Sequence, residues 1–221
     1  MAASEFMYLI ISKHHYNYLM KTTATKTLPE RYTLARTLDL RQTRNLILVN
    51  LFGLILLIAS WIGYAGLANL IHPGSMNFSF SSGNIGEALL SLFTLVIVIV
   101  VMLVVHEGFH GLCFWIFTKT RPLFAFKGFY AYAAAPDWFL PKGQYLITGM
   151  APLVGITVIC VSLMFVLPVW WMSPLVWMLV LNTSGACGDL WMVYWLLRSP
   201  ANVLARDKGD VLEFYTPEKQ Q

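Results

Sequence analysis

Four long apolar stretches limit what this chain of 221 residues can fold into. They cover residues 46–70, 88–118, 145–167 and 175–197. Each is long enough to cross the roughly 30 Å hydrocarbon core of a bilayer as a helix. Hydrophobic residues make up 57% of the chain and charged residues only 12%, against about 25% charged in soluble domains, so much of the surface must face lipid. We therefore predict an all-α membrane protein with four transmembrane helices.

The Lys and Arg residues all lie outside these stretches and orient them. Seven of the fifteen precede residue 46, four lie between the second and third stretches, and four follow residue 197. By the positive-inside rule, both termini and the loop between the second and third helices are cytosolic. We expect an integral protein, most simply of the bacterial cytoplasmic membrane, with a basic segment at 1–45, a membrane domain at 46–197 and a tail at 198–221. The net charge of +4 then reflects topology and contact with the lipid bilayer, and not nucleic-acid binding.

The second apolar stretch contains His106-Glu107-Gly-Phe-His110, the His-Glu-x-x-His pattern of zinc hydrolases. Imidazoles at i and i+4 lie on one face of a helix, about 6 Å apart at Cβ, and the glutamate beside the first can handle a proton. Placing a charged glutamate in hydrocarbon costs at least ~2.5 kcal/mol on insertion scales. This cost indicates that Glu107 has a functional role. The alternative is a pair of buried histidines that hydrogen-bond between helices, with Glu107 as their neutralising partner.

Asp189 is the candidate for a third metal ligand, since it and Glu107 are the only acidic residues inside the four stretches. His110 lies nine residues before Lys119, the first cation that follows it. Asp189 lies nine residues before Arg198, and the second and fourth helices run in the same direction, so both sites are about 13 Å below the same surface. Two histidines and one carboxylate leave a fourth position for water, as in catalytic zinc sites. The alternatives for Asp189 are a hydrogen bond between helices or a carboxylate in a substrate channel.

Two further residues are candidates for supporting roles. Asn182 lies two helical turns before Asp189 and could bind a ligand or a substrate carbonyl, although a hydrogen bond that ties two helices is the simpler interpretation. Pro152 lies in the third stretch at a depth close to that of the histidines. Proline removes a helical hydrogen bond and can kink a helix, which near a metal could admit water or an extended substrate. Gly111 is interpreted as a packing residue.

The loop at residues 119–143 has a pattern of its own. In residues 123–132, aromatic and small residues alternate about a glycine, as in a short β-hairpin. Its edge could align an extended substrate strand, or its aromatic side chains could anchor the loop at the membrane surface. Residues 207–215 predict a short strand, and the basic segment 13–44 predicts contact with anionic lipid headgroups. The first six residues are interpreted as an appended segment ahead of a native start at Met7.

Residues 106–110, 151–153 and 182–189 together resemble a family of small membrane proteins described as "putative zincin peptidases", a domain of unknown function. The resemblance covers roughly residues 89–215, and that family is itself similar to the intramembrane site-2-type zinc metalloproteases. Asp189 is followed by Leu and Trp where the site-2 pattern has Gly-Gly.

This resemblance implies an intramembrane zinc metalloprotease. It implies His106, His110 and Asp189 as ligands of Zn²⁺ and Glu107 as the general base. The substrate would be a peptide or a membrane protein, hydrolysed within or near the bilayer by zinc-activated water.

Two other functions fit the same residues. A metal sensor or carrier would use the same ligands without hydrolysis, and a structural assembly module would hold no zinc. A protease predicts that Glu107→Gln abolishes proteolysis and retains the metal, whereas a sensor or carrier would be unaffected by that change. In a structural module, His110→Ala would matter only for stability.

Overall fold

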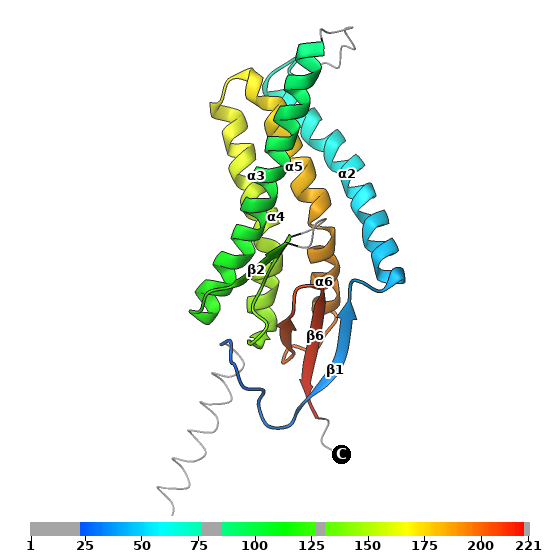
Figure 1. Cartoon of the computed structure of the whole chain (residues 1–221), viewed down its shortest axis with the longest axis vertical. Coiled ribbons are helices and arrows are strands. Elements are labelled where there is room, and N and C mark those ends of the chain that lie inside the picture. Colours follow the sequence, from blue (N-terminus) through cyan, green and yellow to red (C-terminus); the bar gives the residue numbers. More distant parts are fainter. Residues whose placement is uncertain (1–22, 77–84, 127–130, 219–221) are drawn as a thin grey trace, which may run out of the picture.

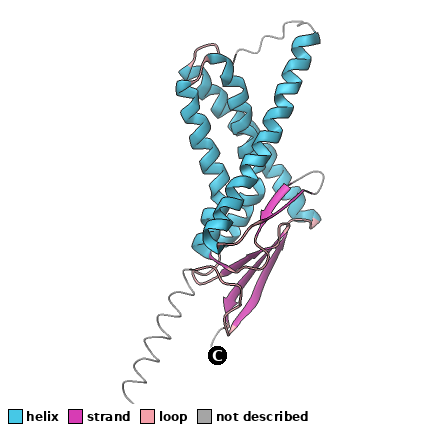
Figure 2. Ribbon diagram, turned by 60° about the vertical axis from the view of Figure 1, so that its left-hand side comes forward, coloured by secondary structure: helices cyan, strands magenta, loops and turns pink. Residues whose placement is uncertain are grey.

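The computed structural model describes residues 23–76, 85–126 and 131–218. Helices form one end of the molecule, and most of the strands lie toward the other end (Figures 1 and 2). The helices are α2 (Thr43–Ile71), α3 (Ile85–Thr118), α4 (Lys142–Val166), α5 (Met172–Gly185) and α6 (Cys187–Leu197), with a 3-10 turn η1 (Val169–Trp171) before α5. The strands are β1 (Tyr32–Asp39), β2 (Leu123–Phe126), β3 (Ala131–Ala134), β4 (Leu140–Pro141), β5 (Leu204–Asp207) and β6 (Val211–Pro217).

Three of these helices, α2, α3 and α4, have the length and the apolar composition needed to cross a membrane. They coincide with the first three predicted spans. Large apolar side chains such as Leu54, Ile62 and Phe93 are exposed on their outer faces. That exposure is unfavourable in water and is what helices facing hydrocarbon require, so the structure is consistent with a membrane protein.

The fourth predicted span, residues 175–197, is not one helix, and that prediction is corrected. α5 ends after 14 residues at Gly185, and α6 begins at Cys187 and runs for 11 residues. Glycines at 185 and 188 flank the turn, and each is about 1 kcal/mol less favourable than alanine inside a helix. The hydropathy averaged over residues 175–197 does not register such a break. Its consequence is that Asp189 lies in the first turn of a new helix, where the helix dipole stabilises a carboxylate.

A four-stranded antiparallel sheet in the order β1-β6-β5-β4 lies at one end of the helices (Figure 2). β1 pairs with β6 from Tyr32↔Pro217 to Asp39↔Val211, so the segments before α2 and after α6 are joined. The strand predicted at residues 207–215 is present in part: residues 211–215 lie in β6, Asp207 ends β5, and residues 208–210 form the turn between them. The predicted all-α class is therefore corrected to a mostly helical fold with a small antiparallel sheet, because pairing between distant segments leaves no local hydropathy signal.

The hairpin predicted in the loop between the second and third spans is also present. β2 pairs with β3 from Leu123↔Ala134 to Phe126↔Ala131, and the connecting residues 127–130 lie outside the described part of the chain. A Cβ added to Gly111 in α3 would collide with the ring of Phe124. Gly111 therefore allows the hairpin to approach α3 closely, as its interpretation as a packing residue requires.

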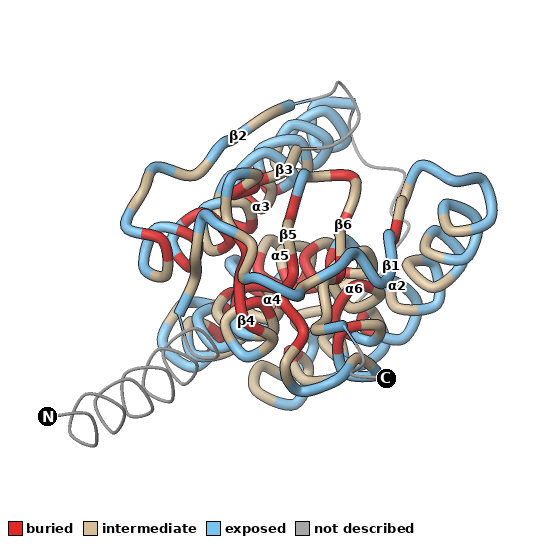
Figure 3. The backbone as a smooth tube through the Cα atoms, turned by 90° about the horizontal axis from the view of Figure 1, so that it is seen from below, coloured by how far each residue is buried: buried red, intermediate tan, exposed pale blue. Residues whose placement is uncertain are grey.

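Two buried clusters hold the helices and the sheet together. The first lies among α2, α4 and α5 and includes Met164 and Leu179, and the second joins α4 and α6 to the sheet and includes Leu196 and Phe214. Viewed from the end where the sheet lies, buried segments gather around α4, α6 and β5, whereas the outer side of α2 is exposed (Figure 3). The C-terminal half of α3 packs against both clusters, so the face that carries His106, His110 and Phe114 is buried in the protein.

Candidate metal centre

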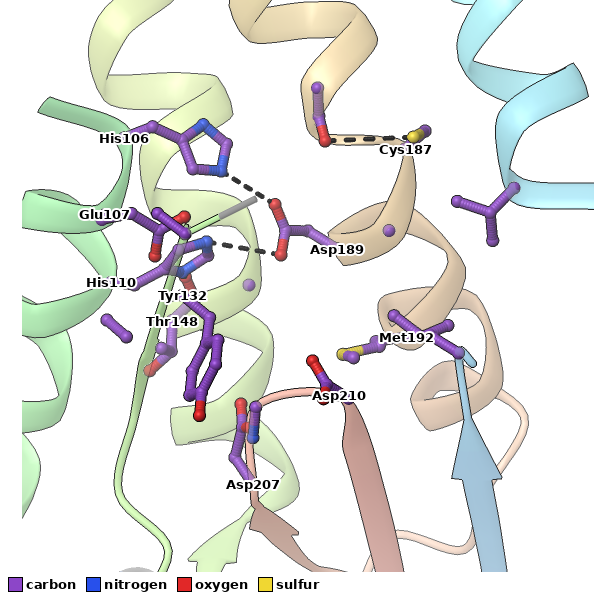
Figure 4. A pocket seen from close by; sticks show the side chains of 18 of the residues that line it. His106, Glu107, His110, Tyr132, Thr148, Cys187, Asp189, Met192, Asp207 and Asp210 are labelled. Carbon is purple, nitrogen blue, oxygen red and sulfur yellow. Dashed lines mark hydrogen bonds and ion pairs between the residues drawn. The ribbon is translucent and has the colours of Figure 1, made fainter. Parts of the chain in front are cut away.

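The two histidines of α3 and the aspartate of α6 converge on one point (Figure 4). Nε2 of His106 lies 3.1 Å from Oδ2 of Asp189, and Nε2 of His110 lies 3.3 Å from Oδ1 of the same carboxylate. The two imidazole rings come from successive turns of α3, with centroids 5.1 Å apart. One ligand atom from each of the three residues lies within 4.8 Å of the others, so together they could hold a metal ion.

Each imidazole is also held from its other side. Nδ1 of His106 donates to Oδ1 of Asn182 at 3.0 Å, and Nδ1 of His110 donates to the carbonyl oxygen of Thr148 at 2.9 Å. Because carbonyl oxygens only accept hydrogen bonds, the proton of each neutral ring lies on Nδ1 and the lone pair of Nε2 faces Asp189. Two lone pairs and a carboxylate that face one another repel, and a shared cation removes that repulsion.

The distances from the Asp189 carboxylate to the two imidazoles suit zinc. Tetrahedral zinc binds nitrogen and oxygen at about 2.0–2.1 Å, which places neighbouring ligand atoms about 3.3 Å apart. The two nitrogen–oxygen distances are 3.1 and 3.3 Å. The histidine side chains are 9% and 10% exposed and that of Asp189 is 22% exposed, so the site is shielded but open on the aspartate side. Two imidazoles and one carboxylate leave one position of a tetrahedron free, as a catalytic zinc site does.

Glu107 lies beside the triad and does not pair with it. The Nε2 atoms of both histidines face Asp189, and among the described residues no ion pair joins either histidine to Glu107. The backbone of Ala133 in β3 forms a hydrogen bond with the Glu107 carboxyl group. Its buried Oε2 has no hydrogen-bond partner in the described part of the chain. This oxygen is therefore available to a water molecule or a substrate, and Glu107 is not the neutralising partner of the histidines.

A cavity of about 620 Å³ lies beside the triad. Its volume is typical of pockets that bind small ligands or short peptide segments. Its wall combines the triad and Glu107 with parts of β3, the start of α2, the start of α6 and the turn between β5 and β6 (Figure 4). The same cavity thus contains both the possible metal site and a strand that could contact a peptide backbone.

The turn between β5 and β6 adds a carboxylate that sequence reasoning missed. Oδ2 of Asp207 accepts a hydrogen bond from the Tyr145 hydroxyl at 2.7 Å, and Oδ1 accepts one from the Gly209 N–H at 2.7 Å. Burial raises the pKa of Asp207 to about 6, although both hydrogen bonds act in the opposite direction. In the sequence, residues 207–215 predicted only a short strand, and no feature of the sequence connected Asp207 to the histidines.

The structure also places the two supporting candidates. Asn182 is fully buried, and its Nδ2 donates to the carbonyl oxygen of Pro152 at 3.4 Å while its Oδ1 accepts from His106. Pro152 is buried inside α4. The juxtaposition of His106, His110 and Asp189 agrees with the depth comparison, and their role as ligands stays a prediction.

All six candidate residues of the site lie on helices α3 to α6, within residues 99–204. No curated protein and no solved structure matches this chain. In agreement with the resemblance seen in the sequence, residues 99–204 match the model of the family described as "Putative zincin peptidase".

Proposed function

We propose that this protein is a membrane zinc metallopeptidase that hydrolyses peptide bonds within or near the bilayer. The position of Glu107 is the observation that carries the proposal: a buried carboxylate oxygen without a partner in the described residues lines the same cavity as the triad. A sensor or carrier needs the three ligands but has no use for this carboxylate. The family match supports peptidase chemistry independently.

The geometry supports a role for each residue of the site. A bound zinc ion supplies a Lewis acid that lowers the pKa of a coordinated water toward ~7 and polarises a carbonyl group. His106, His110 and Asp189 hold the ion. Glu107 accepts the proton of the attacking water and passes it to the leaving amine, as a general base and then a general acid.

The location of the triad supports cleavage inside or close to the membrane. His110 lies eight residues before the end of α3 at Thr118, which corresponds to about 12 Å along a helix that could span a bilayer. The positive-inside rule places this end of α3 on the cytosolic side. A substrate would then be cut near the cytosolic surface.

An extended peptide is the substrate shape that the cavity fits. β3 pairs with β2 along one edge, and its residues 131–133 line the cavity beside Glu107. A peptide strand that pairs with the other edge of β3 would lie next to the triad, with its backbone groups satisfied by the sheet. The hairpin would then align a peptide or membrane-protein substrate.

The test compares Glu107→Gln with Glu87→Gln, a change in the first turn of the same helix and away from the cavity. Full-length protein in proteoliposomes is incubated with zinc and with a library of synthetic apolar peptides of about 20 residues, long enough to span the bilayer. New peptide ends are detected by mass spectrometry, and bound zinc is measured by elemental analysis.

We expect wild type and Glu87→Gln to cleave. Glu107→Gln should retain zinc and lose about 100-fold or more of the rate. A wild-type protein that binds zinc and cleaves nothing, or a Glu107→Gln variant that cleaves at the wild-type rate, would contradict the proposal.

A further inference from the structure

Pro152 lies inside α4 and has no backbone N–H. In an α-helix the N–H of residue 152 would donate to the carbonyl oxygen of residue 148, four positions earlier. The carbonyl of Thr148 therefore lacks its normal helical donor. In this protein that oxygen instead accepts the Nδ1–H of His110 at 2.9 Å.

We infer that Pro152 is a positioning residue of the metal centre: by withholding a backbone donor, it leaves the Thr148 carbonyl to hold His110 with Nε2 directed at the metal position. The inference rests on the proposed metal site and adds a residue that touches no ligand atom. It assigns the proline a role in metal affinity and not only in the shape of the helix.

Because the Thr148 carbonyl and His110 are both buried, their hydrogen bond affects the stability of this region. Thr148 is 2% exposed and His110 is 8% exposed, so bulk water has little access to either group. An unpaired buried carbonyl and an unpaired imidazole N–H would each cost free energy, and here each satisfies the other. Because position 152 supplies no N–H, the Thr148 carbonyl is free to accept the hydrogen bond that His110 needs to donate.

The same turn of α4 also orients the other histidine. The carbonyl oxygen of Pro152 accepts the Nδ2–H of Asn182 at 3.4 Å, which directs Oδ1 of that amide toward Nδ1 of His106 at 3.0 Å. Asn182 has no exposed surface, so the protein alone determines the orientation of its amide. Residues 148 and 152 therefore contribute, directly and through Asn182, to the orientation of both imidazoles.

The test restores the missing donor. In Pro152→Ala, the alanine N–H bonds to the Thr148 carbonyl and competes with His110. The zinc dissociation constant of the full-length protein in detergent, measured by competition with a fluorescent chelator, is expected to rise 10- to 100-fold. The melting temperature of the metal-free protein should stay the same or increase, because proline is unfavourable inside a helix.

Pro174→Ala is the matched control. Pro174 lies in the first turn of α5 and does not line the cavity, so an N–H restored there does not compete for the Thr148 carbonyl. Its zinc affinity is expected to equal that of wild type. A decrease in both proline variants would mean that the loss reflects general packing, and the inference would be wrong.

A second measurement distinguishes the effect of the missing N–H on zinc affinity from the effect of the proline ring. An ester-linked alanine analogue at position 152 has the alanine side chain but an oxygen in place of the N–H, and it should restore wild-type affinity. In metal-free protein with ¹⁵N-labelled histidine, the His110 signal should show the Nδ1–H tautomer in wild type and in the ester form, and a mixture of tautomers in Pro152→Ala.

Unchanged affinity in Pro152→Ala, or no rescue by the ester, would overturn the inference. The tautomer measurement needs no metal and no substrate. A protein that binds zinc but cleaves nothing would therefore refute the proposed peptidase function while leaving this inference standing.

Discussion

His106 and Asp189, 83 residues apart in the chain, place Nε2 and Oδ2 3.1 Å from each other between α3 and α6. Neither residue alone indicates a metal site, since buried histidines and carboxylates also pair without one. Their meeting beside His110, with each ring held through Nδ1, produces three converging donors. This relationship supports zinc binding, and the following predictions depend on it.

Asn182 should matter through its oxygen. Asn182→Ala removes the acceptor of the His106 Nδ1–H and is expected to weaken zinc binding 10- to 100-fold, because the groups that hold ligand histidines contribute about this much to affinity. Asn182→Asp keeps an acceptor at the same place and should bind zinc more tightly than the alanine variant. Chelator competition measures both, and equal losses in the two variants would show that the side chain acts only by filling space.

Two glycines of α3 provide a paired test of the hairpin. A methyl group at Gly108 meets no atom within 4 Å, whereas one at Gly111 would collide with the Phe124 ring of β2. Gly108→Ala should therefore leave peptide cleavage unchanged and gain up to about 1 kcal/mol of helix stability. Gly111→Ala should displace the hairpin and lower cleavage by about tenfold while zinc remains bound. If both variants cleave peptides at the wild-type rate, the hairpin does not align the substrate.

Asp207 should make stability depend on pH. Its pKa is raised by burial to about 6 in the folded protein, compared with about 3.9 in an unfolded chain. The folded state therefore binds this proton more tightly, so the contribution is most favourable below about pH 4 and is lost as the pH rises toward 6. The difference corresponds to about 3 kcal/mol.

Asp207→Asn should remove this dependence in thermal unfolding of the metal-free protein between pH 4 and 6. Asp39→Asn is the control, because hydrogen bonds from Arg41 lower the pKa of Asp39 and its effect has the opposite sign. An Asp207→Asn variant that keeps the wild-type pH profile would show that another group is responsible.

Zinc should stabilise the folded protein. A ligand that binds only the folded state at 100 times its dissociation constant adds about 2.7 kcal/mol to the free energy of unfolding. The melting temperature should therefore rise with added zinc and fall again with a chelator, and His110→Ala should abolish the shift. An equal shift in His110→Ala would place the bound zinc elsewhere.

Local sequence patterns predicted several features correctly. Uninterrupted apolar stretches predicted α2, α3 and α4, and alternating aromatic and small residues predicted the β2–β3 hairpin. The spacing of His110 and Asp189 from the following cations predicted that the two lie at the same depth. These signals depend only on neighbouring residues or on the regular rise of a helix.

Other features depend on tertiary contacts and were not predictable in this way. The pairing of Tyr32–Asp39 with Val211–Pro217 joins segments from opposite ends of the chain, and the basic residues of the first segment suggested lipid contact instead. The break at Ala186 lies among the small and polar residues 182–189, but the average hydropathy of residues 175–197 still predicted a single span. The role proposed for Pro152 depends on matching its missing N–H with the hydrogen bond between Thr148 and His110, which links two different helices.

The zinc content of purified wild type beside Asp189→Ala tests the central claim most directly. Asp137→Ala, which changes an exposed aspartate in the loop before β4, is the control. After dialysis against limiting zinc, we expect about one zinc ion per chain in wild type and in Asp137→Ala, and far less in Asp189→Ala, because the carboxylate shared by both imidazoles is lost. Equal zinc content in all three proteins, or none in wild type, would contradict a metal centre built from His106, His110 and Asp189.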